Sequence, residues 1–258
     1  GETEAVTVEL YAFTCGFLTL PRTFLMKGEK GVITVPVPSY LIVHPKGRVL
    51  FDTGLHEDTL EDPASYVGDV IAKYHTFHFH KGEEISERLR SIGTDPDSIN
   101  IVINSHLHFD HCGGNAQLPN ADILIQTREL THARTTGSTN GYLLTDWDTG
   151  QKVRAVDGEH DVFDDGTVVC LPTYGHTPGH QSLRVQTEKG GEYILCGDAC
   201  YLKDSLEQMR TPGIIADREA ALAVFRRFRD MQARGAQIMF GHDPDFWKTI
   251  PQAPVRLG

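Results

Sequence analysis

Residues 106–111 read His106-Leu107-His108-Phe109-Asp110-His111 and place three imidazoles and one carboxylate within six positions. Histidine and aspartate side chains at this density are typical of a metal site. The apolar residues 99–103 predict a short buried strand before the cluster, and Gly113-Gly114 predicts a turn after it. The cluster is therefore expected on a loop at the end of a strand, where α/β proteins build their sites.

The spacing of the four side chains indicates two metal ions. His106 and His108 are two residues apart, so in an extended segment they point to the same side and can share one ion. Asp110 and His111 follow after the chain begins to turn, so they can face a second ion. A hard carboxylate beside imidazoles suits Zn²⁺ first, with Mn, Fe and Co as alternatives, because metal availability often decides which ion is bound.

Three later segments carry further candidate ligands at the ends of predicted strands. They are His176 and His180 after residues 168–171, Asp198 after residues 193–195, and His242 after residues 237–239. One such residue alone is more often part of a turn or a solvated loop. Four strand ends that each deliver a histidine or an aspartate predict one shared site.

The chain resembles the metallo-β-lactamase superfamily in four motifs, which are HxHxDH at 106–111, GHTPGH at 175–180, GDA at 197–199 and GHD at 241–243. Within the superfamily it is most similar to the N-acyl-homoserine lactonases, whose forms of these motifs are close to SHLHFDHCGGN, GHTPGHQSL and DACY here. The resemblance runs from residue 39 to His242. It implies an α/β fold, the αββα sandwich, in which helices flank two mixed β-sheets.

The resemblance assigns a role to each candidate ligand. It implies that His106, His108 and His176 bind one metal, that Asp110, His111 and His242 bind the other, and that Asp198 bridges both. Tyr201 matches the tyrosine that reaches toward the substrate carbonyl in lactonases. His180 follows the tight Pro178-Gly179 turn, so it is expected to support the site and not to bind metal.

Metal-activated water is the expected nucleophile, because Ser105 lacks the Gly-x-Ser-x-Gly surroundings of a catalytic serine. Coordination lowers the pKa of water from about 15.7 to about 7, which makes hydroxide available at neutral pH. The hydroxide would attack a carbonyl, and Tyr201 would donate a hydrogen bond to the developing oxyanion. Asp110 is the candidate to carry a proton to the leaving alkoxide. These steps open a lactone to a hydroxy acid, which predicts an N-acyl-homoserine lactone hydrolase.

Several other functions fit the same predicted ligands. A lactonase of the pyridoxolactone type and a phosphotriesterase share the expected chemistry. A glyoxalase II-like thioesterase is disfavoured, because that family has a C-terminal helical region and only 16 residues follow His242 here. A metal-stabilised scaffold without turnover is the alternative from a different class, although such proteins lose ligands and this chain has all seven.

Composition narrows the class of protein. The 258 residues are 40% hydrophobic, enough for a sizeable core, and no linker separates His106 from His242, so a single domain over residues 1–258 is expected. No apolar stretch approaches the roughly 20 residues of a transmembrane helix, so no membrane insertion is expected. The net charge of −11 disfavours a nucleic-acid partner, because phosphate binding needs clustered Lys and Arg. The expected partner is a small-molecule lactone.

Five cysteines stand at positions 15, 112, 170, 196 and 200, an odd number without a CxxC motif. This usage predicts reduced thiols and a cytoplasmic location. Three of them flank candidate ligands, so a thiolate ligand is one alternative. Small buried thiols are favoured instead, because Asp198 already fills the matching position.

Two segments are expected to shape the substrate pocket. Residues 15–31 mix apolar residues with breakers, and in the lactonases the matching loop lies over the site. Core packing and a homodimer contact are the alternatives for this loop. Residues 55–82 form the second segment, in which His78 and His80 are expected to be loop residues and not metal ligands. The candidate substrate contacts are Phe17, Leu18, Phe24, Met26 and Phe109.

Local patterns predict further elements. Residues 6–13 alternate as a strand does, and residues 49–51 form a strand that ends in a loop with Asp52. Asp52 is expected to lie close to the metals without binding them. Residues 217–234 show a helical stripe of apolar side chains, and Asp217 is expected to cap this helix.

Overall fold

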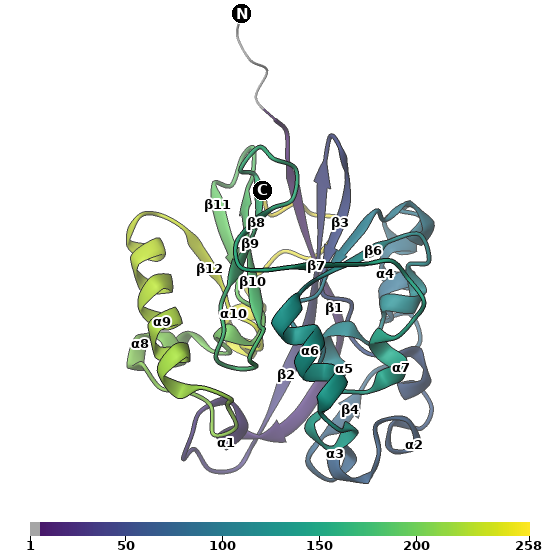
Figure 1. The fold of residues 1–258 in the computed structure, drawn as a ribbon, viewed down its shortest axis with the longest axis vertical. Coiled ribbons are helices and arrows are strands. Elements are labelled where there is room, and N and C mark those ends of the chain that lie inside the picture. Colours follow the sequence, from purple (N-terminus) through teal and green to yellow (C-terminus); the bar gives the residue numbers. More distant parts are fainter. Residues whose placement is uncertain (1–5) are drawn as a thin grey trace, which may run out of the picture.

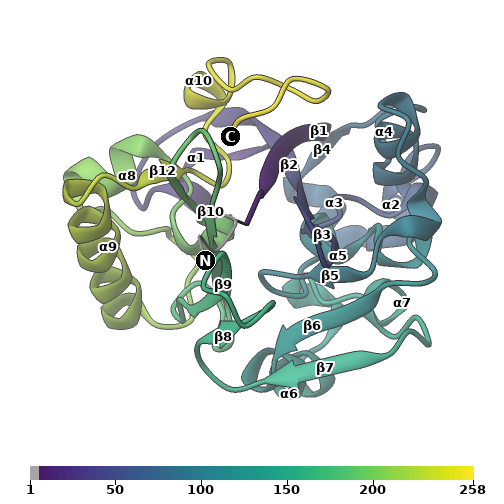
Figure 2. The same cartoon turned by 90° about the horizontal axis from the view of Figure 1, so that it is seen from above.

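Two β-sheets pack against each other in the computed structural model, which describes residues 6–258 (Figure 1). Helices lie on the outer side of each sheet, as the view from above shows (Figure 2). Both sheets contain parallel and antiparallel pairs. The αββα sandwich with two mixed sheets that the motifs implied is therefore confirmed.

The first sheet has seven strands in the order β4-β1-β2-β3-β5-β6-β7. They are β1 (Glu9–Pro21), β2 (Val32–His44), β3 (Gly47–Phe51), β4 (Thr76–His78), β5 (Ile101–Ile103), β6 (Asp122–Gln126) and β7 (Val153–Val156). β3, β5, β6 and β7 run parallel, and the remaining pairs are antiparallel. The loops that follow β3, β5 and β6 consequently lie at one edge of this sheet.

The second sheet has five strands in the order β12-β11-β10-β9-β8. They are β8 (His160–Asp161), β9 (Val168–Pro172), β10 (Gln181–Gln186), β11 (Glu192–Leu195) and β12 (Gln237–Met239). β10 is antiparallel to both β9 and β11, and β11 is parallel to β12. β9, β11 and β12 therefore point the same way, so the three downstream ligand loops leave the sheet at one edge.

The central strands bury both of their faces. In β3, Val49 and Phe51 pack between the sheets, whereas Leu50 packs under the helices of the first sheet. In β5, Ile101 and Ile103 face the second sheet in the same way. Successive side chains of a strand point to opposite faces, so a strand covered on both sides needs a continuous apolar run. This explains why the strands before the ligand loops carry almost no polar residue.

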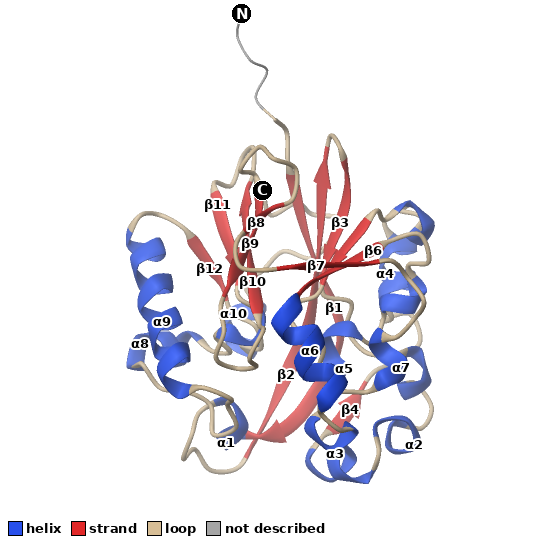
Figure 3. Ribbon diagram, viewed as in Figure 1, coloured by secondary structure: helices blue, strands red, loops and turns tan. Residues whose placement is uncertain are grey.

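The described residues contain ten α-helices, which flank the two sheets or lie in the connections between strands (Figure 3). The longest is α9, which packs Val224, Phe225 and Phe228 on the outer face of the second sheet. The Asp217 side chain accepts a hydrogen bond from the Ala220 backbone N–H at 3.0 Å, which confirms the predicted cap. The helices are α1 (Arg22–Leu25), α2 (Pro63–Val67), α3 (Asp69–Tyr74), α4 (Ile85–Ser91), α5 (Phe109–Cys112), α6 (Thr127–Thr135), α7 (Leu144–Trp147), α8 (Lys203–Gln208), α9 (Arg218–Ala233) and α10 (Pro244–Trp247). The 3₁₀ turns are η1 (Glu57–Thr59), η2 (Pro96–Ser98), η3 (Asn115–Gln117), η4 (Ser138–Asn140) and η5 (Gly197–Ala199).

The prediction of a loop over residues 15–31 is wrong for its first part. β1 continues to Pro21 and pairs with β2 along its length, with an irregularity between Thr14 and Phe17. Gly16 has a φ of +89° at this point, a conformation that glycine adopts at little cost. The bulge interrupts the alternating pattern of the sequence, and this hides the strand from a search for period-two alternation. Residues 55–82 likewise contain η1, α2, α3 and β4.

No helix within residues 6–258 is both long and apolar enough to span a membrane.

The turn after the first ligand loop has no room for a side chain at Gly113. A Cβ there would overlap the backbone nitrogen of His56 and lie 2.7 Å from the carbonyl oxygen of Phe109. We expect Gly113→Ala to lower the free energy of unfolding by about 1 to 3 kcal/mol, or roughly 2 to 12 °C in Tm. Gly137 faces open space, so Gly137→Ala is the matched control with an unchanged Tm. Thermal unfolding of the two variants measures the difference, and equal Tm values would contradict this packing.

Candidate metal centre

Seven side chains converge in two groups where the two sheets meet. The first group is His106, His108, His176 and Asp198, and the second is Asp110, His111, Asp198 and His242. Within each group the potential ligand atoms all lie within 4.8 Å of one another. The structure thus brings together all seven residues in the two sets that the resemblance implied, with Asp198 in both.

Each ligand comes from a loop that follows a strand. His106 and His108 follow β5, and Asp110 and His111 lie on the short helix α5. The three loops of the second sheet complete the site, with His176 after β9, Asp198 after β11 and His242 after β12. The two edges described above therefore face each other across the site.

The distances between ligand atoms are those of atoms arranged around a cation. In the first group, His108 Nδ1 lies 3.0 Å from His106 Nε2 and 3.3 Å from His176 Nε2. In the second group, Asp198 Oδ1 lies 3.1 Å from His111 Nε2 and 3.0 Å from His242 Nε2. Four ligands bound tetrahedrally to zinc at about 2.0 to 2.1 Å stand roughly 3.3 to 3.4 Å apart. The geometry fits a metal ion in each group.

Hydrogen bonds on the far side of the rings aim the histidines at the site. Nδ1 of His111 lies 2.7 Å from Asp52 Oδ2, and Nδ1 of His242 lies 2.7 Å from the carbonyl oxygen of Pro36. Nδ1 of His106 lies 2.9 Å from the hydroxyl of Ser105, which itself donates to Asp52. A hydrogen bond at Nδ1 leaves Nε2 free to bind metal, so Asp52 supports the site without being a ligand.

One acceptor in the centre has no well-aligned donor. Asp198 Oδ1 is buried and forms no hydrogen bond of normal geometry with any described residue, although Nε2 of His111 and Nε2 of His242 lie 3.1 and 3.0 Å away. Leaving a buried carboxylate oxygen unsatisfied costs free energy, and a cation would satisfy it. This orphaned oxygen, together with the converging imidazole nitrogens, indicates that the residues fit a divalent metal.

Burial and neighbouring carboxylates set the ionisation of the histidines. Burial lowers the pKa of His108 to about 3, and the nearby His176 adds to this effect. Burial also opposes the charged form of His242, but the Asp198 and Asp110 carboxylates outweigh it and raise the pKa of His242 to about 10. A metal ion would replace that proton, because only a neutral imidazole binds metal.

His180 has both ring nitrogens engaged outside the two groups. Its Nε2 accepts a hydrogen bond from the backbone N–H of Asp198 at 3.0 Å, and its Nδ1 lies 2.9 Å from the hydroxyl of Thr173. It therefore holds the loop that carries Asp198, in keeping with the supporting role expected from its position after Pro178-Gly179.

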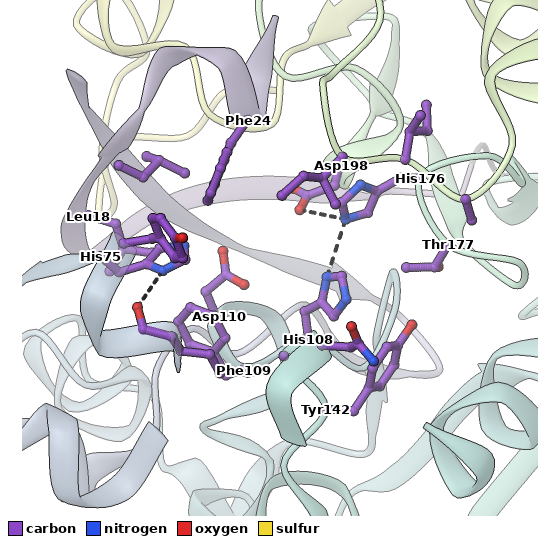
Figure 4. Close-up of a pocket in the computed structure, with 18 of the residues that line it drawn as sticks. Leu18, Phe24, His75, His108, Phe109, Asp110, Tyr142, His176, Thr177 and Asp198 are labelled. Carbon is purple, nitrogen blue, oxygen red and sulfur yellow. Dashed lines mark hydrogen bonds and ion pairs between the residues drawn. The ribbon is translucent and has the colours of Figure 1, made fainter. Parts of the chain in front are cut away.

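A cavity of about 520 Å³ opens onto both groups (Figure 4). One part of its wall is apolar and comes from β1, α1, β2 and α3; another part is more polar and comes from the segments around α6, η4 and the loop after His176. The apolar lining includes Leu18, Leu20, Phe24, Leu25, Val35 and Ile71, and the polar lining includes His132, Thr136, Asn140 and Thr177. The site can therefore take a molecule with both a polar and an apolar end.

The structure places only three of the five candidate substrate contacts in this cavity. Leu18, Phe24 and Phe109 line it. Phe17 is 37% exposed and stands next to Leu18 on β1, so its side chain points to the opposite face of the strand. Met26 is buried just after α1 and does not line the cavity. The prediction that Phe17 and Met26 contact the substrate is therefore wrong.

Two further residues line the site without belonging to any of the four motifs. Tyr142 lines the cavity with its ring 4.7 Å from the ring of His108, and His75 lines the opposite side. Neither belongs to a motif. His75 lies in residues 55–82, the segment that was expected to shape the pocket, whereas Tyr142 lies outside both predicted segments and reaches the site only through the fold. His78 and His80 belong to neither metal group. His78 lies in β4 and is hydrogen-bonded to Thr19, so the prediction of a loop residue is wrong for His78.

All five cysteines are buried and free, and no cysteine belongs to either metal group. Burial raises the pKa of Cys15 to about 12, which keeps this thiol protonated. The interpretation of the cysteines as small buried thiols is confirmed.

The family model for the metallo-beta-lactamase superfamily matches residues 32–234. The chain belongs to the metallo-β-lactamase superfamily. This confirms the superfamily that the four motifs indicated.

Lactonases are among the most similar relatives. N-acyl homoserine lactonase AttM of Azorhizobium caulinodans is 35% identical over 257 residues, which cover 96% of this chain and 97% of that protein. N-acyl homoserine lactonase AiiA of Bacillus thuringiensis subsp. kurstaki is 31% identical over 224 residues, with coverage of 86% and 87%. The predicted resemblance to the lactonases is confirmed.

Solved structures show the same relationship. An N-acyl homoserine lactone hydrolase with the product N-hexanoyl-L-homoserine at its catalytic metal center matches with a TM-score of 0.88 and 29% identity, covering 98% of this chain and 99% of that one. The dizinc quorum-quenching lactonase AidC matches with a TM-score of 0.72 at 16% identity, covering 98% and 94%, and shares the fold.

The two ligand groups predict how many metal ions the chain binds. We expect two equivalents of zinc per chain after dialysis, and one in His242→Ala, because this variant loses a ligand of the second group only. His80→Ala is the control, since His80 is exposed and belongs to neither group. Elemental analysis of the dialysed proteins counts the ions. Two equivalents retained by His242→Ala would exclude the second group as a metal site.

Proposed function

We propose that this chain is a hydrolase that opens the lactone ring of N-acyl-homoserine lactones with two divalent metal ions, Zn²⁺ first among them. The observation that carries the proposal is the pair of ligand groups joined by Asp198 at the end of a cavity with one apolar wall. The lactonase relatives cover almost the whole chain and support the same substrate class.

The seven ligands suit zinc, since they combine five imidazoles with two carboxylates. When bound, two such ions polarise a carbonyl and make water nucleophilic at neutral pH. The protein supplies the remaining tasks, which are to hold the substrate, to donate a hydrogen bond to the carbonyl oxygen and to move a proton.

Tyr201 is positioned to donate a hydrogen bond into the cavity. Its hydroxyl lies 3.2 Å from Nδ1 of His176, whose Nε2 belongs to the first metal group. With Nε2 given to a metal, Nδ1 carries the ring hydrogen and donates to the Tyr201 oxygen, which leaves the hydroxyl hydrogen for the substrate. Burial raises the pKa of Tyr201, and the Asp198 and Asp110 carboxylates raise it further, so the phenol stays protonated.

Asp110 is positioned to move the proton. Its Oδ2 lies 3.3 Å from His111 Nε2 and 3.4 Å from His242 Nε2, and the residue also lines the cavity. Burial would raise the pKa of Asp110, but the two histidines outweigh it and hold that pKa well below its usual range. An ionised carboxylate here can accept a proton from the attacking water and pass it to the alkoxide released from the ring.

The cavity supports an acyl lactone as the substrate. Its volume of about 520 Å³ lies within the range of small-molecule sites, roughly 300 to 1,000 Å³. The apolar wall can bury an acyl chain, which contributes roughly 0.8 kcal/mol per CH₂ group.

Three expectations from the sequence remain predictions. They are a single domain over residues 1–258, a cytoplasmic location and a homodimer.

A substrate panel tests the reaction class. We expect kcat/KM for N-hexanoyl-homoserine lactone to exceed that for γ-butyrolactone, a glutathione thioester and a phosphotriester by at least about tenfold, because only the first fills both the metal site and the apolar wall. Acid release in a pH-stat measures the three carboxylic substrates, and product absorbance measures the phosphotriester. A higher value for the thioester or the phosphotriester would exclude the lactonase assignment. A protein that binds two zinc ions but hydrolyses none of these four substrates would be a metal-stabilised scaffold.

Two substitutions separate the proposed roles. Asp110→Asn should abolish lactone hydrolysis, because it removes both a ligand and the proton carrier. Tyr201→Phe should lower kcat by about 10- to 1,000-fold, because it removes one hydrogen bond to the oxyanion. Tyr11→Phe is the matched control, since the Tyr11 hydroxyl bonds to Glu9, outside the site. Steady-state kinetics of lactone hydrolysis measure kcat for each variant. A kcat equal to that of the wild type in either variant would remove that residue from the mechanism.

A further inference from the structure

We propose that Glu129 is a positioning residue that holds the loops of His108 and His176 in place and thereby sets the affinity of the first metal group. This inference rests on the proposed function, because it presumes that the group binds metal. Glu129 lies in the first turn of α6, and its side chain is completely buried. None of the four motifs contains it.

Each carboxylate oxygen of Glu129 accepts hydrogen bonds near a different ligand. Oε2 accepts the backbone N–H of Leu107 at 3.1 Å, and Leu107 lies between His106 and His108. Oε1 accepts the hydroxyl of Thr177 at 2.7 Å, and Thr177 follows His176 directly. One side chain therefore ties a loop of the first sheet to a loop of the second sheet next to three of the four ligands.

Two more donors complete the set. The Gly179 backbone N–H donates to Oε1 at 3.3 Å, and the Tyr142 hydroxyl donates to Oε2 at 2.8 Å. A carboxylate is the side chain that can accept from two donors at each end, whereas an amide offers one oxygen and one NH₂ group. All four partners are neutral, so burying this charge costs free energy that only strong hydrogen bonds offset.

The contact with Tyr142 reaches a ligand histidine whose ring nitrogen outside the metal groups has no hydrogen-bond partner among the described residues. His106, His111, His176 and His242 each have a hydrogen-bond partner at Nδ1, the nitrogen outside the metal groups. Nε2 of His108 forms no hydrogen bond with any described residue, and its ring instead packs edge to face on Tyr142 at 4.7 Å. Tyr142, His108 and Thr177 lie close together in Figure 4. Glu129 thus orients His108 through the Tyr142 ring.

The loop after His176 also packs directly on the start of α6. A Cβ at Gly179 would overlap the backbone nitrogen of Glu129, so the two segments are in contact with no side chain between them. In the motif at 175–180, His176 is the ligand, Thr177 and Gly179 bind Glu129, and His180 holds Asp198. Every contact of Glu129 with the ligand loops concerns the first metal group, whereas Asp52 bonds directly to His111 of the second.

Zinc titration against a competing chelator tests the inference. Wild-type protein should bind two equivalents, and Glu129→Ala should bind one of them about 10- to 100-fold more weakly, the usual cost of removing a partner of metal ligands. Glu129→Gln keeps one acceptor oxygen and should fall between the two. Glu207→Gln is the matched control, because Glu207 is exposed on α8 and, among residues 6–258, forms an ion pair only with Lys203. Excess zinc should restore hydrolysis by Glu129→Ala.

Double variants show which metal group is affected. Glu129→Ala combined with His242→Ala should leave no tightly bound zinc, because each change weakens a different group. Glu129→Ala combined with His176→Ala should still bind one equivalent, because both changes affect the first group. One tight equivalent in the first double variant, or equal weakening of both equivalents in Glu129→Ala, would overturn the inference.

If Glu129→Ala does not fold, Thr177→Val removes a single donor at nearly constant volume. Thr177→Val should lower the affinity for the zinc ion of the first group by a smaller factor than Glu129→Ala does. Unchanged affinity for both zinc ions would overturn the inference. The failure of the proposed function gives a different result, since wild-type protein would then bind no zinc or hydrolyse no lactone.

Discussion

The shared carboxylate of Asp198 is the constraint on which the rest of the site depends. Its Oδ2 lies 3.3 Å from His176 Nε2 and its Oδ1 lies 3.0 Å from His242 Nε2, so it joins two ligand groups that come from different loops. A short side chain can reach both groups only if its backbone is fixed. The hydrogen bond to His180 fixes it on one side, and the tight turn at Gly197, with a φ of +56°, fixes it on the other. A Cβ at Gly197 would lie 2.9 Å from the side chain of Ser105, so this turn requires glycine.

The charges around the site explain why it favours cations. Asp52, Asp110 and Asp198 are carboxylates with histidines as their only ion-pair partners among the described residues. Glu129 adds a fourth buried carboxylate whose hydrogen-bond donors are all neutral. Removing four negative charges from water is costly unless positive charge is close by. Raised pKa values at His111 and His242 supply part of that charge as protons, and divalent ions supply it more fully.

Much of the site could be predicted from the sequence, because a metal site needs rare side chains at fixed offsets from strand ends. His106, His176, Asp198 and His242 follow short apolar runs that can only be buried strands, so both the ligands and the sheets are visible together. The pocket was harder to predict. The bulge after Thr14 shifts the alternation of β1, and this change sends Phe17 to the surface and Leu18 into the cavity. Glu129 and Tyr142 carry no local signal, because their roles arise from contacts between segments that are distant in the sequence.

The ligands alone do not choose a substrate, since one fold and one set of metal ligands can serve several hydrolytic reactions. Selection must come from the wall of the cavity, and that wall is built by a local elaboration of the first sheet. β1 and β2 are thirteen residues each, and α1 lies between their far ends (Figure 1). Leu18, Leu20 and Val35 line the cavity from these strands, and Phe24 and Leu25 line it from α1. A change in this hairpin would alter the shape of the acyl site while leaving the strand ends that hold the ligands in place. The chemistry therefore depends on the segments after β5, β9, β11 and β12, and the selectivity depends on side chains of β1, α1 and β2, so a side-chain change in this hairpin can alter one without the other.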